Sequence, residues 1–212
     1  MLEKQVDLIL DRRNPLFILQ NYLEKKEVQN RIIKTQIPQY VEIAITFDVE
    51  HDYGLQGGSD STISPFLSEI QKTLGKKIPS TFFVQGNLIE KYCKTLIELE
   101  NAGHEIGLHG WGHEQWGNAW FLKGTATTEV KQLLEKSIRK FEKCGLRKPV
   151  SFRAPYMVLS KENVMVLEKY GFTIDSSAQS FRGEEPLIKK MRNVYEIPVS
   201  ADPIPIFKSN GT

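Results

Sequence analysis

Strand and helix signals alternate along this chain from residue 41 onward. Short runs rich in apolar, β-branched and aromatic residues alternate with longer segments whose apolar residues recur at helical spacing. The predicted strands span 41–48, 80–86, 105–109, 150–155, 172–175 and 193–200, and the predicted helices span 64–75, 87–103, 127–145 and 160–171. This alternation predicts an α/β fold with a largely parallel sheet, either open or closed into a barrel.

Two of the predicted helices carry further local signals. The segment 87–103 has Asn87 at the expected N-cap, Glu90 three residues later and Gly103 at its end. The segment 127–145 gathers apolar residues on one helical face, namely Val130, Leu133, Leu134, Ile138 and Phe141. Both segments are long enough to cover a parallel sheet.

Reactive side chains stand where three of the predicted strands end. Asp48 ends the first strand, His109 ends the third, and Arg153 lies near the end of the fourth. Ligands of parallel α/β folds bind at the carboxyl ends of the strands. We therefore expect a functional site at this edge of the sheet.

The spacing of two histidines indicates a metal site. His109 and His113 lie four residues apart, with Gly110 and Gly112 between them. The glycines disfavour a helix, so we expect the pair on a tight loop after a strand. Two imidazoles and a carboxylate from elsewhere in the chain form a typical hydrolytic metal site with one position left open for water.

Asp48 and Glu50 supply candidate carboxylates. Residues two apart on an extended chain point to the same side, so one could bind the metal while the other takes a proton from metal-bound water. Arg153 could orient the second carboxylate by a bidentate contact, and a backbone N–H near Tyr156 could stabilise an oxyanion. Together these groups would hydrolyse an amide or an ester.

Three short motifs resemble those of the polysaccharide deacetylase (NodB-homology) family, in the same order. The resemblance runs from about residue 43 to 180 and rests on Thr46-Phe47-Asp48, on the histidine pair with its loop, and on Arg153-Ala154-Pro155-Tyr156. It implies a distorted or incomplete (β/α) barrel and metal-dependent removal of N-acetyl groups from sugars. It also implies roles for individual residues: Asp48 as base, His109 and His113 as ligands, Arg153 as partner of the base, and Tyr156 as oxyanion donor.

The chain departs from the family pattern at several positions. Val49 replaces a second aspartate and cannot bind a metal, but Asp48-Val49-Glu50 fits an Asp-x-Glu variant of the family. We therefore expect Glu50 as the third ligand, with Asp52 and His51 as alternatives. Gly110 replaces a serine or threonine, so any hydroxyl contact from that position is lost.

The C-terminal part also departs from the family pattern. No histidine follows His113, although the family uses a late histidine as general acid, and Asp175 matches the fourth motif only poorly. We expect a polysaccharide-deacetylase-like catalytic domain over 41–212 that is cut short at its C-terminus. Residues 1–40 lack the strand and helix alternation, and we expect them to form a helical N-terminal extension.

Residues that would contact a sugar are less sharply marked. Trp111, Trp116 and Trp120 could form a stacking platform, although packing aromatics are at least as common. We expect Trp111, Pro155 and Asp175 to bind substrate. Zinc is the favoured metal for two histidines and a carboxylate, while cobalt, nickel and iron bind similar ligands.

Composition excludes several classes of function. The net charge is +2, with 40% hydrophobic and 25% charged residues, which is typical of soluble globular proteins and gives no basic stripe for nucleic acid. The sequence shows no signal peptide and no membrane span. Cys93 and Cys144 lack metal or redox spacing, so we expect two free thiols in a reducing compartment and a cytoplasmic protein.

The sequence as a whole predicts a metal-dependent hydrolase that acts on carbon–nitrogen bonds. Its substrate would be a carbohydrate or sugar conjugate from which an N-acyl group, above all N-acetyl, is removed. Two alternatives remain open: an amidohydrolase of a small cyclic ureide or formamide, and an inactive carbohydrate-binding relative. The sequence does not determine the oligomeric state.

Overall fold

The structure is a computed structural model that describes residues 43–52, 59–75, 77–118, 123–178 and 188–199. Residues 43–177 and 188–197 belong to one compact unit, and the account below concerns that unit alone. The predicted helical extension over 1–40 lies outside the described residues.

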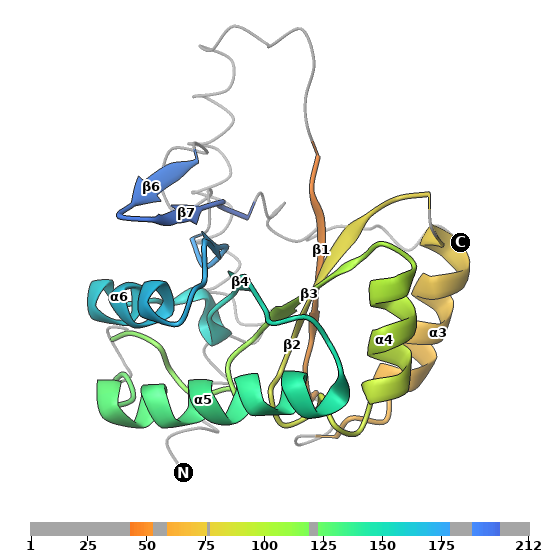
Figure 1. Cartoon of the computed structure of the whole chain (residues 1–212), viewed down its shortest axis with the longest axis horizontal. Coiled ribbons are helices and arrows are strands. Elements are labelled where there is room, and N and C mark those ends of the chain that lie inside the picture. The colour runs from red at the N-terminus through yellow and green to blue at the C-terminus, as the bar shows by residue number, and fades with distance from the viewer. Residues whose placement is uncertain (1–42, 53–58, 76, 119–122, 179–187, 200–212) are drawn as a thin grey trace, which may run out of the picture. The chain divides into compact units, whose positions relative to one another are not determined.

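The described strands form one sheet whose strands are mainly parallel (Figure 1). They are β1 (Ile45–Val49), β2 (Ser80–Val84), β3 (Glu105–Leu108), β4 (Ser151–Phe152), β5 (Ile174–Asp175), β6 (Lys189–Met191) and β7 (Val194–Glu196). Their order is β1-β2-β3-β4-β5-β7-β6, and every neighbouring pair is parallel except β6 and β7. Among the described strands the sheet does not close, which confirms the predicted α/β fold with an incomplete barrel.

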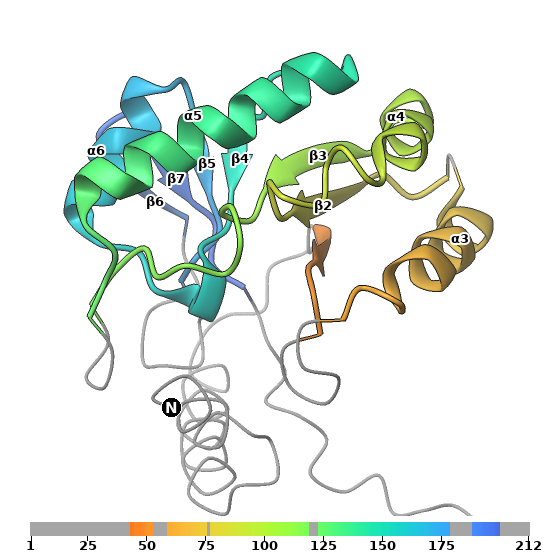
Figure 2. The same cartoon turned by 90° about the horizontal axis from the view of Figure 1, so that it is seen from below.

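Four helices connect or follow these strands, and Figure 2 shows them along one side of the sheet. They are α3 (Ile63–Leu74), α4 (Cys93–Asn101), α5 (Thr127–Cys144) and α6 (Lys161–Lys169). In α5 the predicted apolar face is buried at Val130, Leu134, Ile138 and Phe141. The helix ends at Gly145, whose left-handed φ of 75° suits a residue without a Cβ atom.

Alternate residues of the first two strands face different surroundings. Phe47 and Phe82 stack at 5.1 Å between ring centroids and contribute to the core beneath the helices, and Phe47 also meets Phe66 of α3. Residues one position away, such as Asp48 and Phe83, lie on the opposite face, because side chains alternate along a strand. That second face carries the candidate site.

The predicted start of the second helix is wrong. Helix α4 begins at Cys93, and its N-cap is Tyr92 instead of Asn87. The segment before it forms turns, held by a hydrogen bond from the N–H of Tyr92 to the carbonyl of Leu88. Glu90 does not cap a helix but forms ion pairs with two lysines of α5, Lys140 and Lys143.

The expectation of two free thiols is also wrong in this structure. Cys93 and Cys144 form a disulfide that joins the start of α4 to the end of α5, with 5.7 Å between their Cα atoms. Structural disulfides persist mainly in oxidising compartments, so the thiol argument for a cytoplasmic location no longer holds. Among the described residues, no helix is both long and apolar enough to span a membrane.

Candidate functional site

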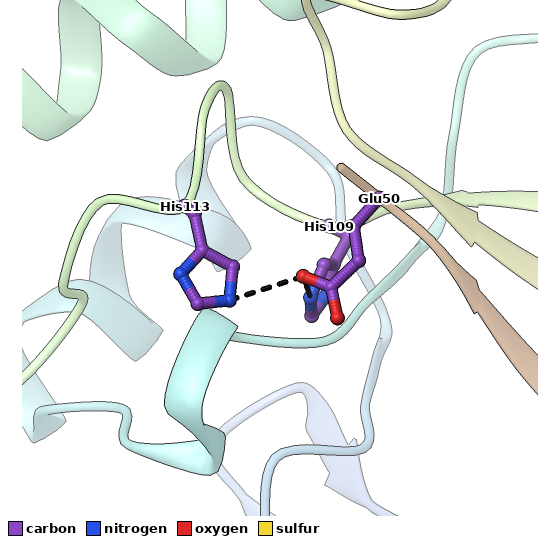
Figure 3. Close-up of side chains that lie close together, drawn as sticks. All are labelled: Glu50, His109 and His113. Atoms are coloured by element: carbon purple, nitrogen blue, oxygen red, sulfur yellow. Dashed lines mark ion pairs between the residues drawn. The ribbon is translucent and has the colours of Figure 1, made fainter. Parts of the chain in front are cut away.

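Glu50, His109 and His113 come together at the carboxyl ends of β1 and β3. Oε2 of Glu50 lies 3.3 Å from Nε2 of His109 and 3.0 Å from Nε2 of His113. Figure 3 shows both imidazole rings turned toward this one carboxylate oxygen. The three ligand atoms lie within 4.8 Å of one another, and within the described ranges they form the one cluster able to hold a metal ion.

The backbone around the histidine pair confirms the predicted loop. Residues 110–112 form a turn, with Gly110 in the left-handed region at a φ of 65°. His113 also has a positive φ, 71°, a conformation that costs a non-glycine residue on the order of 1–3 kcal/mol. Contacts around the loop must offset this cost, so the second histidine is held by its surroundings and not by local preference.

A backbone hydrogen bond sets the tautomer of His109. The ring atom Nδ1 lies 2.9 Å from the carbonyl oxygen of Arg153, and a carbonyl can only accept a hydrogen bond. Nδ1 therefore carries the proton, and in the neutral ring Nε2 directs a lone pair toward Glu50. Metal-binding histidines are commonly oriented in this way.

The charges of the three groups influence one another strongly. Burial alone would raise the pKa of Glu50, but its short contacts with His109 and His113 and their charges outweigh that effect and lower the pKa to about 2. Burial alone would lower the pKa of His109, but Glu50 and the charge of Asp48 raise it above its ordinary value. The contacts therefore favour the ionised form of Glu50 and the protonated form of His109.

The donor set fits a divalent cation. Oε2 of Glu50 is buried and makes no hydrogen bond of acceptable geometry, although two ring nitrogens lie nearby. Two nitrogens and one carboxylate oxygen match the three protein ligands of open zinc sites. The residues that would hold a metal are therefore Glu50, His109 and His113.

Arg153 links the predicted base to three strands of the sheet. It is 4% exposed, and its Nη1 donates to Oδ1 of Asp48 at 2.7 Å. Nη2 donates to Oγ1 of Thr46 and to Oγ of Ser176, both at 2.9 Å, and Nε donates to the carbonyl of Ser176 at 3.0 Å. The guanidinium carbon also lies 4.3 Å from the ring centre of Phe83. The predicted pairing of Arg153 with Asp48 is present, through one oxygen only.

Tyr156 lies beside the second histidine. Its ring centre is 4.3 Å from that of His113, and its backbone is left-handed with a φ of 60°. The next residue, Met157, has a similar φ of 57°. Two consecutive residues in this sparsely populated region, both in the short 3-10 helix η1 (Pro155–Met157), mark a backbone shaped by its surroundings. The predicted oxyanion role of Tyr156 stays a prediction.

Two of the residues predicted to bind substrate contact other side chains in this structure. Asp175 is fully buried, accepts a hydrogen bond from Oγ of Ser177, and lies beside Glu196. Burial and this second carboxyl raise its pKa well above the ordinary range, so Asp175 is a structural acid within the sheet. Nζ of Lys136 lies 3.9 Å from the ring centre of Trp111, which is partly buried, and the predicted contact of Trp111 with a sugar stays a prediction.

The remaining candidates occupy packing positions or lie outside the site. Pro155 is buried against Gly110, where an added Cβ atom would lie 3.1 Å from Cγ of the proline. Trp116 is fully buried, which excludes it from a stacking platform, and Trp120 lies outside the described residues. His51, an alternative ligand, instead contacts Oε1 of Gln85 through both its backbone N–H and its ring.

Sequence reasoning missed several side chains that support the site. Ser176 holds Arg153, and Oγ of Ser177 accepts a hydrogen bond from the backbone N–H of Ala154. Glu114 accepts hydrogen bonds from the histidine loop. The serines directly follow a strand end, which is the signal that could have found them. Glu114 carried no such signal, because its partners become visible only in the folded loop.

Comparison with known proteins agrees with this geometry. The family model for polysaccharide deacetylase matches residues 38–174. The chain is 23% identical over 180 residues to the peptidoglycan-N-acetylmuramic acid deacetylase PdaC of Bacillus subtilis, a match that covers 82% of this chain and 35% of that protein. It is 30% identical over 151 residues to the peptidoglycan deacetylase of Helicobacter pylori, covering 64% of this chain and 50% of that protein.

The fold also resembles that of a solved structure. A protein of Mycobacterium smegmatis assigned to the polysaccharide deacetylases superposes with a TM-score of 0.57 and 25% identity, over 74% of this chain and 58% of that one. The chain thus spans between a third and three fifths of the length of these relatives. Since the family model covers well over half of the sequence, the chain belongs to the polysaccharide deacetylase family.

Proposed function

We propose that this protein is a metal-dependent hydrolase that removes N-acetyl groups from a carbohydrate. The observation that carries the proposal is the convergence of Glu50, His109 and His113 beside the Asp48–Arg153 pair. The relatives are named as deacetylases of peptidoglycan and, in one yeast protein, of chitin. We therefore assign N-acetylated amino sugars as the substrate class and zinc as the favoured metal.

The residues of the site divide the chemistry between them. A divalent cation held by Glu50, His109 and His113 would act as a Lewis acid for water and for the acyl carbonyl. Asp48 is the group we assign to take the proton from the attacking water. Arg153 orients the carboxylate of Asp48 by its hydrogen bond to Oδ1.

The leaving amine also needs a proton. We assign the step to Asp48, which returns the proton it took from water to the nitrogen as the carbon–nitrogen bond breaks. The products are a free amino sugar and acetate, and the carboxylate of Asp48 is regenerated.

A metal titration tests the proposal directly. The metal-free protein would be titrated calorimetrically with zinc, cobalt or nickel, beside the double variant His109→Ala/His113→Ala and the variant Glu50→Gln. Glu142→Gln serves as a matched control, because Glu142 is an exposed glutamate of α5 that does not belong to the cluster of candidate ligands. We expect about one metal per chain in the wild type and in the control, and none in the double variant.

Activity is then measured as acetate release from N-acetylglucosamine oligomers. Turnover that needs both the metal and Asp48 supports the proposal. Sugar binding without metal or turnover would instead identify an inactive carbohydrate-binding relative. Hydrolysis of formamide or a cyclic ureide, with no acetate from sugars, would move the assignment to small amides. A cytoplasmic location stays a prediction, and the redox state of Cys93 and Cys144 in protein from its native source tests it.

A further inference from the structure

The carboxylate of Glu114 joins the histidine loop, which runs from His109 to His113, to the buried indole of Trp116. Oε1 accepts hydrogen bonds from the backbone N–H of Trp111 at 2.8 Å and from the indole N–H of Trp116 at 2.9 Å. Oε2 accepts from the N–H of Gly112 at 2.8 Å and, more weakly, from that of Trp111 at 3.1 Å. One carboxylate thus accepts from two backbone N–H groups of the turn between His109 and His113.

The loop has room for this carboxylate because residue 110 is glycine. A Cβ atom built on Gly110 would lie 2.9 Å from Oε1 of Glu114, and 3.1 Å from both Cγ of Pro155 and Nε1 of Trp116. A side chain at position 110 and the carboxylate of Glu114 therefore compete for the same space. In this chain the loop is held from within by Glu114, and no hydroxyl from position 110 is needed.

The carbonyl groups of the same loop are held by hydrogen bonds to the segment that follows β2. The carbonyls of Gly110 and Trp111 accept hydrogen bonds from the N–H groups of Gly86 and Asn87 at 2.8 and 3.0 Å. These contacts fix the start of the turn against the segment that follows β2. Glu114 adds contacts to the N–H groups of Trp111 and Gly112, directly before His113 with its positive φ.

Trp116 connects this arrangement to the core. Its side chain is fully buried and its ring centre lies 4.3 Å from that of Phe152 in β4. Its carbonyl accepts hydrogen bonds from Nδ2 of Asn163 at 2.7 Å and from the N–H of Ser160 at 3.0 Å. The hydrogen bond from the indole N–H of Trp116 to Glu114 therefore ties the loop to a residue that the core holds in place.

We propose that Glu114 is a positioning residue for the metal centre. By joining the N–H groups of the turn to the indole of Trp116, it holds His113 at the distance from His109 and Glu50 that a shared metal requires. Glu114 itself contributes no ligand atom to the cluster. This inference rests on the proposed metal-dependent function.

The test compares Glu114→Ala, Glu114→Gln and the control Glu142→Ala. Zinc affinity is measured calorimetrically, the cobalt(II) absorption spectrum reports the ligand geometry, and amide hydrogen exchange is followed in the metal-free proteins. Loss of a group hydrogen-bonded to a metal ligand typically weakens metal affinity 10- to 100-fold. Because Glu114 acts through the backbone of the loop and not on a ligand atom, we expect a loss of about 10-fold for Glu114→Ala, the lower end of that range. We expect an altered cobalt spectrum and faster exchange at the N–H groups of Trp111 and Gly112.

Glu114→Gln keeps one carbonyl acceptor of the same length, so we expect it to regain part of the affinity lost in the alanine variant. If Glu114→Ala does not fold, Glu114→Gln alone must show weaker zinc binding and an altered spectrum. Wild-type affinity and an unchanged cobalt spectrum in both folded variants would overturn the positioning role while leaving the proposed function intact. A wild-type protein that binds no metal would overturn the proposed function, and the positioning role with it.

Discussion

Replacing Arg153 should cost this protein more stability than replacing any exposed arginine. Arg153→Met keeps an unbranched apolar stem that can still pack on Phe83, but it removes all four hydrogen bonds of the guanidinium. The side chain of Arg153 is 5% exposed and that of Asp48 is 30% exposed. The substitution therefore leaves the partly exposed carboxylate of Asp48 without its partner.

The magnitude follows from what is left unpaired. Breaking a buried ion pair by removing one partner costs about 3–5 kcal/mol, and the partial exposure of Asp48 places this case near the lower end. The buried carbonyl of Ser176 also loses a donor, while the hydroxyls of Thr46 and Ser176 can rotate toward other partners. We expect a loss of about 3–4 kcal/mol in the free energy of unfolding, or about 6–16 °C in Tm for a chain of this size.

Urea denaturation followed by circular dichroism measures this loss in the metal-free protein. Arg147→Met is the matched control, because Arg147 is an exposed arginine that pairs with Glu100 at the surface. Surface pairs of this kind contribute little, so the control should stay close to the wild type. The stability of Arg153→Lys should lie between those of Arg153→Met and the wild type, since an ammonium group cannot make all the hydrogen bonds of the planar guanidinium. If Arg153→Met loses no more stability than Arg147→Met, the bridging role assigned to Arg153 is refuted.

Two further substitutions test the electrostatics and the packing around the site. The lowered pKa of Glu50 contributes stability that is fully present above pH 4.5, its ordinary pKa, and that is lost as the pH falls toward about 2. The raised pKa of His109 contributes stability that is fully present below pH 6.5, its ordinary pKa, and that is lost as the pH rises through the raised pKa. Urea melts of metal-free Glu50→Gln at a series of pH values should therefore show both dependences flattened, and unchanged slopes would contradict the pairing. Gly107→Ala places a Cβ atom 2.5 Å from Oγ of Ser151 and 2.8 Å from Cδ1 of Phe83, so we expect thermal melts to show a loss of about 1–3 kcal/mol. Adding Ser151→Ala should recover part of that loss, and a Gly107→Ala protein as stable as the wild type would show that the sheet accommodates the methyl group.

The predictable parts of the fold are those specified by local sequence. Helix α5 was predicted to within a residue, because its apolar face repeats without interruption and Gly145 ends it. The start of α4 was not, because the N–H groups of Gly86 and Asn87 bond to the histidine loop, and the local capping signal at Asn87 does not show this contact between distant segments. Strand β6 was missed because its exposed residues pair only with β7 and show no apolar alternation.

In the candidate site, too, the features specified by local sequence were predictable and the contacts between distant segments were not. The spacing of Asp48 and Glu50 and the glycines beside His109 are local features, and the structure brings these residues to one place as the spacing predicts. The burial of Asp175 and the approach of Lys136 to Trp111 depend on contacts between distant segments, which a single sequence does not show. The sequence therefore predicted the grouping of the metal-ligand candidates but not the burial of Asp175.

The bridge made by Arg153 has a consequence for the order of events during folding. Its partners Asp48 and Thr46 lie 105 and 107 residues earlier in the chain, so β1 and β4 must both be in place before the bridge can form. Contacts of such long sequence separation are slow to form, whereas α5 can form early from local contacts. In a refolding experiment, recovery of metal binding should lag behind the helical signal and report the completed sheet.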